Sequence, residues 1–222
     1  DSPENIAYKS LAVNLSDIAA MGAIAKWFTL AITLPKLDET WLKKFSESLK
    51  DTSSKYNVCL IGGDTTKGPL SITINMMGVV EKSKAIKRSG ANIGDNIYVS
   101  GELGDAALCL KRINEGEQPD KAQMLKLNRP LPRLDLGHAL NGVASSCIDI
   151  SDGLEQDLSH IIKASKVGAI IDVQKLPLSQ SVANYIEANN DWSVPLCGGD
   201  DYELCFTAPK NFNSEIIKIA KV

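Results

Sequence analysis

Hydrophobic and polar residues follow two different periods along the first third of the chain. An apolar residue at every third or fourth position predicts a helix from Pro3 to about Met21, with Ser2 as its N-cap. A second amphipathic helix is expected directly after Asp38. Strict alternation over residues 26–34 and 71–80 predicts two strands. This order of helices and strands is typical of an α/β unit.

The candidate chemistry of this first half lies between the second predicted helix and the last predicted strand, over residues 58–66. A short apolar run over residues 58–61 predicts a buried strand that ends at Gly62 and Gly63. Asp64 and two threonines follow, and the glycines allow a ligand to approach the main chain closely. A carboxylate at such a strand end is suited to hold a metal ion beside phosphate groups. A tight turn in which Asp64 caps the next element explains the segment equally well.

The second half of the chain also alternates between strand and helix patterns. Strands are expected over residues 96–100, 147–150, 169–173 and 202–207. Helices are expected over residues 105–113, 124–127, 134–144, 154–162, 180–188 and 214–220. The polar segment 81–94 carries four basic residues and predicts a link between two domains, residues 1–86 and residues 92–222. Within it, Arg88 is able to reach a bound anion, although a solvated run of charges is the simpler interpretation.

Composition narrows the class of protein. The 222 residues are 44% hydrophobic and 23% charged with a net charge of −3, as in an ordinary globular protein that does not bind nucleic acid. No apolar run has the length of a membrane span, and no signal-peptide pattern begins the sequence. Five scattered cysteines without C-x-x-C spacing indicate reduced, buried thiols and a cytoplasmic protein. With only two histidines, a zinc site or a catalytic triad is improbable, so enzyme chemistry would rest on carboxylates.

Five aspartates stand at the ends of predicted elements, several beside glycines: Asp17, Asp64, Asp149, Asp152 and Asp200. Together they predict hard oxygen ligands for Mg²⁺, which retains waters and bridges substrate phosphates. Each also has a simpler explanation, namely a helix cap, a turn, or a carboxylate satisfied by nearby backbone. No Walker lysine motif is present, so metal ions, backbone amides and Arg88 would hold a nucleotide. Ser151 lies at a helix N-terminus, which favours a bound phosphate.

Five longer blocks of sequence resemble the thiamine-monophosphate kinase family: Asn14–Ala23, Ile61–Pro69, Arg88–Ala91, Asp149–Leu154 and Gly198–Phe206. They occur in the family's order and span nearly the whole chain. The wider superfamily contains aminoimidazole-ribonucleotide synthetase, selenophosphate synthetase and a hydrogenase-maturation protein. The resemblance implies ATP-dependent phosphorylation of thiamine monophosphate to thiamine diphosphate by direct, Mg²⁺-assisted in-line transfer.

The resemblance also assigns roles to individual residues. It implies Mg²⁺ ligands at Asp17, Asp64, Asp149 and Asp152. It implies ATP contacts at Gly63, Asp64, Arg88 and Ser151, of which Asp64 and Arg88 act in catalysis. Asp200 stands where the family has a glutamate that contacts thiamine. Because Asp is one methylene shorter, its neighbour Asp201 is an alternative for that contact.

At the level of architecture, the resemblance implies an α/β fold of the α+β type with two domains. The N-terminal sheet-plus-helices domain would pair edge to edge in a homodimer, with ATP, thiamine monophosphate and several Mg²⁺ ions bound and no nucleic acid or membrane partner. Family members are longer at both ends, so we expect both domains to be incomplete and the 222-residue chain alone to have poor activity. The alternatives are another ATP-using synthetase of the superfamily, of the purine-pathway or selenophosphate type, and a nucleotide-binding domain without turnover.

Overall fold

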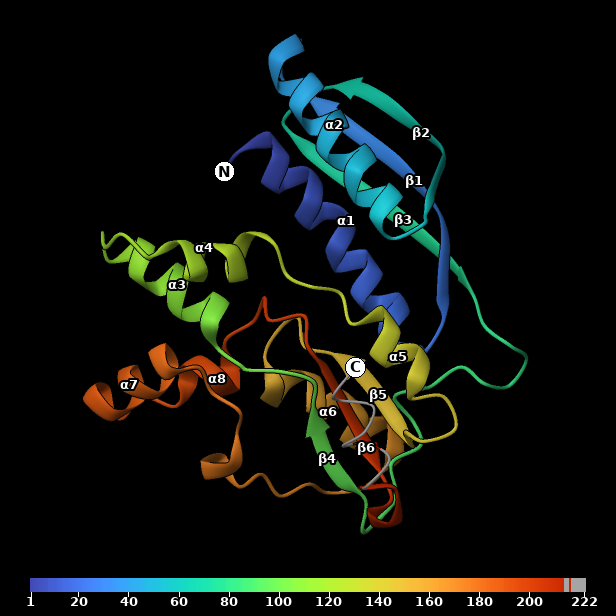
Figure 1. Ribbon diagram of the computed structural model, residues 1–222, viewed down its shortest axis with the longest axis vertical. Helices are drawn as coiled ribbons and strands as arrows, with labels where there is room; N and C mark the ends of the chain where they lie inside the picture. The colour runs from blue at the N-terminus through green and yellow to red at the C-terminus, as the bar shows by residue number, and fades with distance from the viewer. Residues whose placement is uncertain (214–215, 217–222) are drawn as a thin grey trace.

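The computed structural model describes residues 1–213 and 216, and in this part the chain forms two three-stranded sheets with helices packed on them (Figure 1). The first sheet contains β1 (Ile24–Leu34), β2 (Cys59–Lys67) and β3 (Ser71–Val79) in the order β2-β1-β3. Strand β2 runs parallel to β1, and β3 runs antiparallel to it. The predicted strands at 26–34 and 71–80 are therefore confirmed, whereas the helix expected over 214–220 lies outside the described residues, apart from residue 216.

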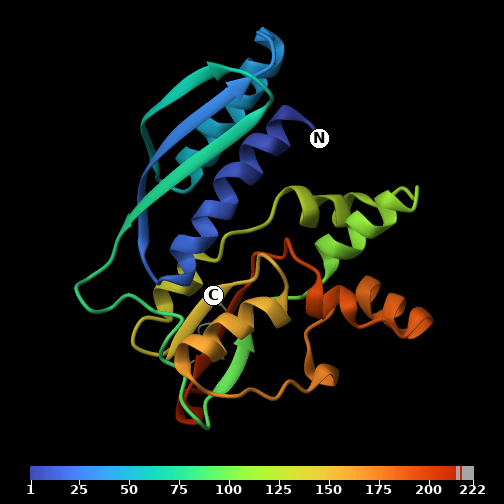
Figure 2. The ribbon, with the colours of Figure 1, turned by 180° about the vertical axis from the view of Figure 1, so that it is seen from behind.

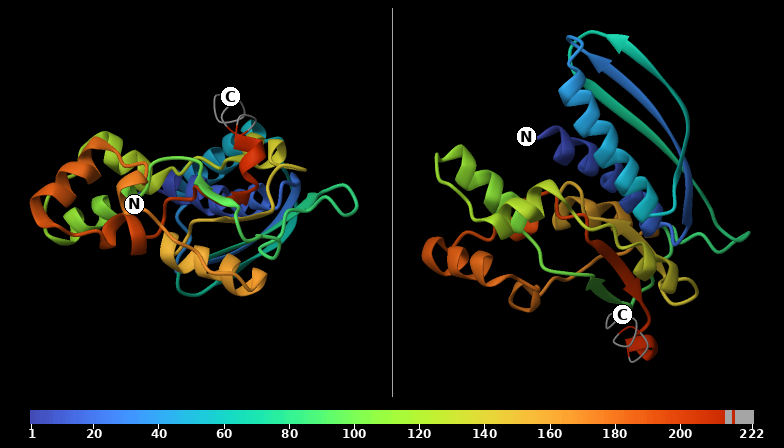
Figure 3. Two further views of the ribbon diagram at one scale, coloured as in Figure 1. Left: turned by 90° about the horizontal axis from the view of Figure 1, so that it is seen from below. Right: turned by 45° about the horizontal axis from the view of Figure 1, so that its top comes forward.

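Helices α1 (Pro3–Ala20) and α2 (Glu39–Lys55) pack on one side of this sheet (Figures 2 and 3). Both begin where the sequence predicts, because the Ser2 side chain accepts from the Asn5 amide at 3.2 Å and Asp38 accepts from the Trp41 amide at 3.0 Å. Their apolar faces meet the inner face of β1 in one core, which contains Leu11, Leu15, Phe28, Ile32, Phe45 and Leu49.

Strand β2 corrects the prediction of a buried strand that ends at two glycines. All nine of its residues are exposed, and it continues through Gly62 and Gly63 to Lys67. An apolar run indicates a strand but not its neighbours, and β2 is an edge strand with β1 as its one partner in the described sheet. The register shifts beside Ile61, which bulges the strand. A Cβ on Gly63 would lie 1.9 Å from the Leu30 carbonyl oxygen, so this close pairing requires glycine.

The second sheet contains β4 (Asn96–Val99), β6 (Leu204–Ala208) and β5 (Ser146–Asp149), with β6 in the centre and antiparallel to both neighbours. Side chains along β6 alternate between two cores. One lies under α6 (Leu154–Ser165) and includes Ile148, Ile150, Leu158, Ile161 and Cys205. The other lies on the opposite face and includes Ala19, Ala20, Leu140, Cys147, Leu204 and Phe206. The C-terminal turn of α1 therefore packs on the second sheet as well as the first.

The remaining helices are α3 (Asp105–Asn114), α4 (Lys121–Asn128), α5 (Leu134–Ala139), α7 (Gln180–Asn189) and α8 (Ser193–Cys197), with 3₁₀ turns at Val173–Lys175 and Lys210–Phe212. Helix α5 ends earlier than the predicted residue 144. The strand predicted over 169–173 is wrong, because the described chain offers it no pairing partner and Ile170 is 95% exposed. Strand β6 begins later than predicted, since Asp200 and Tyr202 take left-handed backbone angles, φ 72° and 52°.

All five cysteines are free thiols, as the sequence predicts, but not all are buried. Cys109, Cys147 and Cys205 are buried, whereas Cys59 on β2 and Cys197 at the end of α8 are exposed. Separately, none of the helices in the described part of the chain combines the length and apolar character that crossing a membrane requires.

Candidate functional site

Asp17 and Asp149, two of the predicted metal ligands, come together where the end of α1 meets the end of β5. Burial, together with the neighbouring charge of Asp17, raises the pKa of Asp149 to about 6. Burial also raises the pKa of Asp17, which is opposed by the nearby charge of Arg88. Two carboxylates held this close favour a cation between them.

Ser16 completes this group from the buried side of α1. Its side chain is fully buried, and its hydroxyl makes no hydrogen bond of good geometry in the structure. It nevertheless lies near enough to Asp149 to favour the charged carboxylate and to lower its pKa. An unpartnered hydroxyl beside two carboxylates is a set of hard oxygen donors that fits Mg²⁺. No three metal-binding side chains of the described residues converge in one place, so water and phosphate oxygens would fill the other ligand positions.

Arg88 lies beside this pair because the segment 81–94 is attached to the second sheet. The Cys147 amide donates to the Lys87 carbonyl at 3.1 Å, and the Ser165 hydroxyl donates to the Arg88 carbonyl at 3.1 Å. The guanidinium is close enough to Asp17 to lower the pKa of that carboxyl. Arg88 is exposed to solvent and lies near Asp17, so it is able to reach an anion bound there.

The loop from Asp149 to Gly153 is held by a residue that the sequence reasoning missed, Asp157. This carboxylate is 3% exposed and accepts from the amides of Ser151 and Asp152, each at 2.9 Å. Neither Ser151 nor Asp152 caps α6, because its N-cap is Gly153 without a side-chain bond. The position of Asp157 in the sequence does indicate this role, because an acidic residue in the first turn of a helix is able to accept from backbone amides of the preceding loop that have no other partner.

The second Gly-Gly-Asp loop packs directly on this first loop. The Asp200 amide donates to the Ser151 carbonyl at 2.9 Å, and the Tyr202 amide donates to the Ile150 carbonyl at 2.8 Å. A Cβ on Gly199 would lie 2.3 Å from the Ser151 carbonyl oxygen, so glycine permits the contact. Lys9 of α1, also missed from the sequence, donates from Nζ to Asp200 Oδ2 at 2.8 Å.

The residues after Asp200 anchor the loop. Asp201 accepts with both oxygens from the Gly104 amide, at 3.1 and 3.0 Å, and burial raises its pKa to about 7. Glu203 accepts from Arg133 Nε and Nη2 at 2.7 and 2.6 Å, and the Ser100 hydroxyl also donates to it. Thus Asp201 is bonded within the fold, whereas Asp200 faces the side of α1.

Gly63 and Asp64 lie apart from this group, on the exposed edge strand β2. Asp64 is in a strand rather than a turn, and its Oδ1 accepts from the Thr65 amide at 2.9 Å. Within the described chain, no hydrogen bond or ion pair joins it to Asp17 or Asp149. Asp152 shares the loop with Asp149 and accepts from Gln156 at 2.9 Å.

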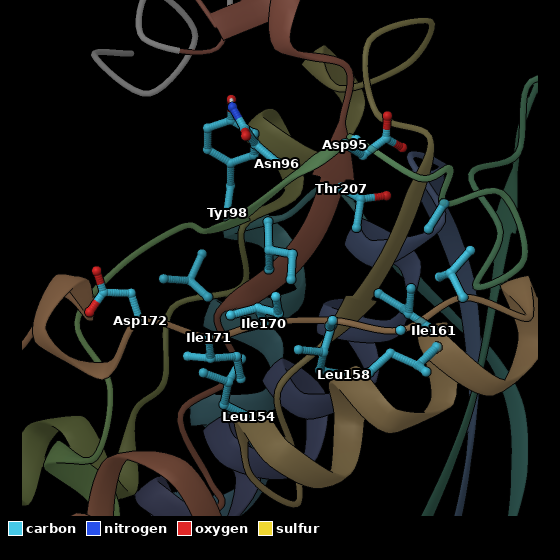
Figure 4. A pocket seen from close by; sticks show the side chains of 18 of the residues that line it. Asp95, Asn96, Tyr98, Leu154, Leu158, Ile161, Ile170, Ile171, Asp172 and Thr207 are labelled. Atoms are coloured by element: carbon cyan, nitrogen blue, oxygen red, sulfur yellow. Dashed lines mark hydrogen bonds between the residues drawn. The ribbon is translucent and has the colours of Figure 1, made fainter.

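Three hollows lie near these loops, and they differ in whether predicted site residues line them. The largest, about 900 Å³, is mostly apolar and lies between β4, α6 and residues 167–177, with Leu158, Ile161 and Ile171 among its lining (Figure 4). No predicted site residue is among its described lining residues. A groove of about 590 Å³ is lined by Ser151, Gly198, Gly199, Asp200 and residues of α3. Another of about 370 Å³ is lined by Lys9, Ser10, Asn14, Tyr202 and neighbours. The two smaller grooves are therefore the candidates for a phosphorylated ligand, because Ser151, Asp200 and Lys9 line them.

Comparison with known proteins agrees with this arrangement. Residues 1–80 match the family described as AIR synthase related protein, N-terminal domain. The crystal structure of thiamine-monophosphate kinase from Stenotrophomonas maltophilia K279a superposes with a TM-score of 0.94 at 40% identity, over 99% of this chain and 72% of that one. The structure of AaThiL complexed with AMPPCP and TMP has a TM-score of 0.88 at 32% identity, over 95% of this chain and 70% of that one.

The match over residues 1–80 thus places the first sheet with α1 and α2 in the AIR synthase-related class. Thiamine-monophosphate kinase of Haemophilus influenzae is 51% identical over 219 residues, which is 97% of this chain and 67% of that protein. The chain belongs to the thiamine-monophosphate kinase family, as the sequence blocks predict. It spans about two thirds of the length of that relative.

Proposed function

We propose that the protein transfers the γ-phosphoryl group of ATP to thiamine monophosphate, giving thiamine diphosphate and ADP. The family supports this reaction, because AaThiL binds AMPPCP, a non-transferable ATP analogue, together with TMP, which we take to be thiamine monophosphate. The observation that carries the proposal is the acidic group at the end of α1, where the exposed Asp17 lies beside the buried Asp149 and near Arg88. Such a group suits the phosphates of a nucleotide better than an apolar ligand.

The reaction needs no strong general base. The second pKa of a phosphate monoester is roughly 6, so the acceptor phosphate is largely ionised at neutral pH. One of its oxygens forms a bond to the γ-phosphorus, the bond from that phosphorus to the β,γ-bridging oxygen breaks, and ADP leaves with the electron pair. Catalysis then consists of positioning and of stabilising charge, and Arg88, near Asp17, would supply a positive charge for the second task.

Asp17, Asp149, Asp152 and Asp64 would hold the Mg²⁺ ions, which neutralise phosphate charge when bound. The buried, unpartnered Ser16 hydroxyl supports a cation beside the first two carboxylates. Ser151 would contact the nucleotide from the loop that Asp157 holds. Gly63 and Asp64 would approach the nucleotide phosphates from β2, whose nine residues are all exposed.

We also propose two domains, residues 1–86 and 92–222, and a homodimer formed through the first sheet. Strand β2 lies at an edge of this sheet with all nine residues exposed, and apolar side chains at this edge and on β1 are exposed as well, including Trp27 at 43% and Ile61 at 55%. Sedimentation should therefore give twice the chain mass, and Trp27→Lys should shift the protein toward the monomer. We place the reaction in the cytoplasm, which the five free thiols support.

The test of the proposed reaction is product formation with matched acceptors. The protein is incubated with Mg²⁺, ATP and either thiamine monophosphate or thiamine, and the products are separated by chromatography. Thiamine diphosphate should form only from the monophosphate. ADP release only with a formylglycinamidine-type acceptor would identify a purine-pathway synthetase instead. Binding of Mg·ATP without any product from the intact protein would identify a nucleotide-binding domain without turnover.

A further inference from the structure

Helix α1 carries a polar stripe that links the carboxylate pair to the second Gly-Gly-Asp loop. Lys9 and Asp17 are eight residues apart, so their side chains point about 80° apart around the axis and share one side of the helix. They are two turns apart, about 12 Å along the axis at 1.5 Å per residue. Ser10 and Asn14 flank this side, and both line the groove of about 370 Å³.

The residues that face this stripe come from two loops that are bonded to each other. Asp149 lies beside Asp17, and Asp200 bonds to Lys9 at 2.8 Å. The two loops are joined by the hydrogen bond from the Asp200 amide to the Ser151 carbonyl at 2.9 Å. The fold therefore places a cationic position at a fixed separation from the carboxylate pair, on the same side of the same helix.

The Lys9–Asp200 ion pair itself is only partly buried. Its side chains are 27% and 32% exposed, and Lys9 lines the groove of about 370 Å³ while Asp200 lines the groove of about 590 Å³. An ion pair exposed to this degree contributes little to stability, because water competes for both charges. A ligand with its own charges is therefore able to open the pair without loss of the surrounding fold.

We propose that Lys9 is the residue that binds the phosphate of the acceptor, and that Lys9 and Asp200 form their ion pair with each other when the acceptor is absent. This inference rests on the proposed function. Thiamine monophosphate carries an anionic phosphate and a cationic thiazolium ring, so it complements the opened pair. Its phosphate replaces the Asp200 carboxylate as the partner of the Lys9 ammonium. Its cationic ring system then lies beside the Asp200 carboxylate and balances that charge. The stripe then directs the acceptor phosphate toward the phosphates held near Asp17.

The experiment compares the binding of thiamine monophosphate with that of unphosphorylated thiamine, by titration calorimetry in the presence of Mg²⁺. Lys9→Gln should weaken binding of the monophosphate at least tenfold, because a hydrogen bond between two charged groups is lost. Binding of thiamine should change less than threefold. Lys9→Arg should recover part of the loss, and Lys50→Gln, an exposed lysine on α2, should change neither ligand.

Three results would overturn the inference. Equal weakening of both ligands by Lys9→Gln would show that Lys9 merely holds the Asp200 loop on α1. No weakening of either ligand would show that Lys9 does not meet the acceptor. Failure of Lys9→Arg to recover affinity, in a variant with the unmodified melting temperature, would also count against it. Failure of the proposed function has a different signature, namely that the unmodified protein binds neither ligand or yields no thiamine diphosphate.

Discussion

Replacement of Arg133 by methionine would leave the Glu203 carboxylate without its main partner. Both oxygens of that carboxylate accept from the guanidinium, at 2.7 and 2.6 Å, and only 8% of the Glu203 side chain is exposed. Removing one member of a buried ion pair costs about 3–5 kcal/mol, because the remaining charge stays desolvated. The donation from Ser100 still supports the carboxylate, so we expect about 3 kcal/mol.

Urea unfolding measures this loss. With a denaturant slope of about 2–3 kcal/mol per molar, a loss of 3 kcal/mol lowers the midpoint by about 1–1.5 M. The matched control is Arg112→Met, since Arg112 meets the mostly exposed Glu117 at 3.7 Å and should lose less than about 1 kcal/mol. Adding Glu203→Gln to Arg133→Met should recover part of the loss. A loss of less than about 1 kcal/mol in Arg133→Met, or no recovery in the double variant, would refute the reasoning.

Three further predictions concern β2 and the anchoring carboxylate Asp201. Asp64→Asn should lower kcat/KM for phosphoryl transfer more than about tenfold, a loss of ~1.4 kcal/mol of transition-state stabilisation. A smaller effect would show that Asp64 does not hold a metal ion that takes part in the reaction. Gly63→Ala should lower the melting temperature, because its Cβ would lie 1.9 Å from the Leu30 carbonyl oxygen. Gly62→Ala is the control, since a Cβ there meets nothing within 4 Å. Equal melting temperatures of the two variants would contradict the contact with Leu30. Burial raises the pKa of Asp201 to about 7. Between about pH 4 and 7 this carboxyl is therefore ionised in the unfolded chain but protonated in the folded one, so the wild type loses stability as pH rises through this range. Asp201→Asn should therefore be about 2 kcal/mol more stable than wild type at pH 8, within an upper bound of ~4 kcal/mol, and urea unfolding should show this advantage vanish near pH 4.

Local signals made α1 and α2 predictable. Ser2 and Asp38 each cap a helix through bonds that span three residues, so the information lies within one turn of sequence. The errors arise where pairing is not local. The apolar runs at 58–61 and 169–173 look alike in sequence, yet the first is an exposed edge strand and the second has no partner strand in the described chain. Which segment lies beside a strand depends on the whole fold.

The candidate site shows the same limit. The sequence predicted Asp17 and Asp149 as acidic residues at element ends, but their meeting depends on α1 reaching both sheets. Lys9 was missed because a single lysine on an amphipathic helix usually faces solvent, and its partner Asp200 lies far along the chain. The spacing from Lys9 to Asp17 was the one available signal, since it places both on the same side of α1.

Transfer of labelled phosphate tests the central claim most directly. The protein is incubated with Mg²⁺, thiamine monophosphate and ATP labelled in the γ-phosphate, alongside Asp17→Asn as a control that should lose the reaction. Labelled thiamine diphosphate should form in equal amount to ADP. ADP with the label in inorganic phosphate, or no labelled thiamine diphosphate from the intact protein, would contradict it.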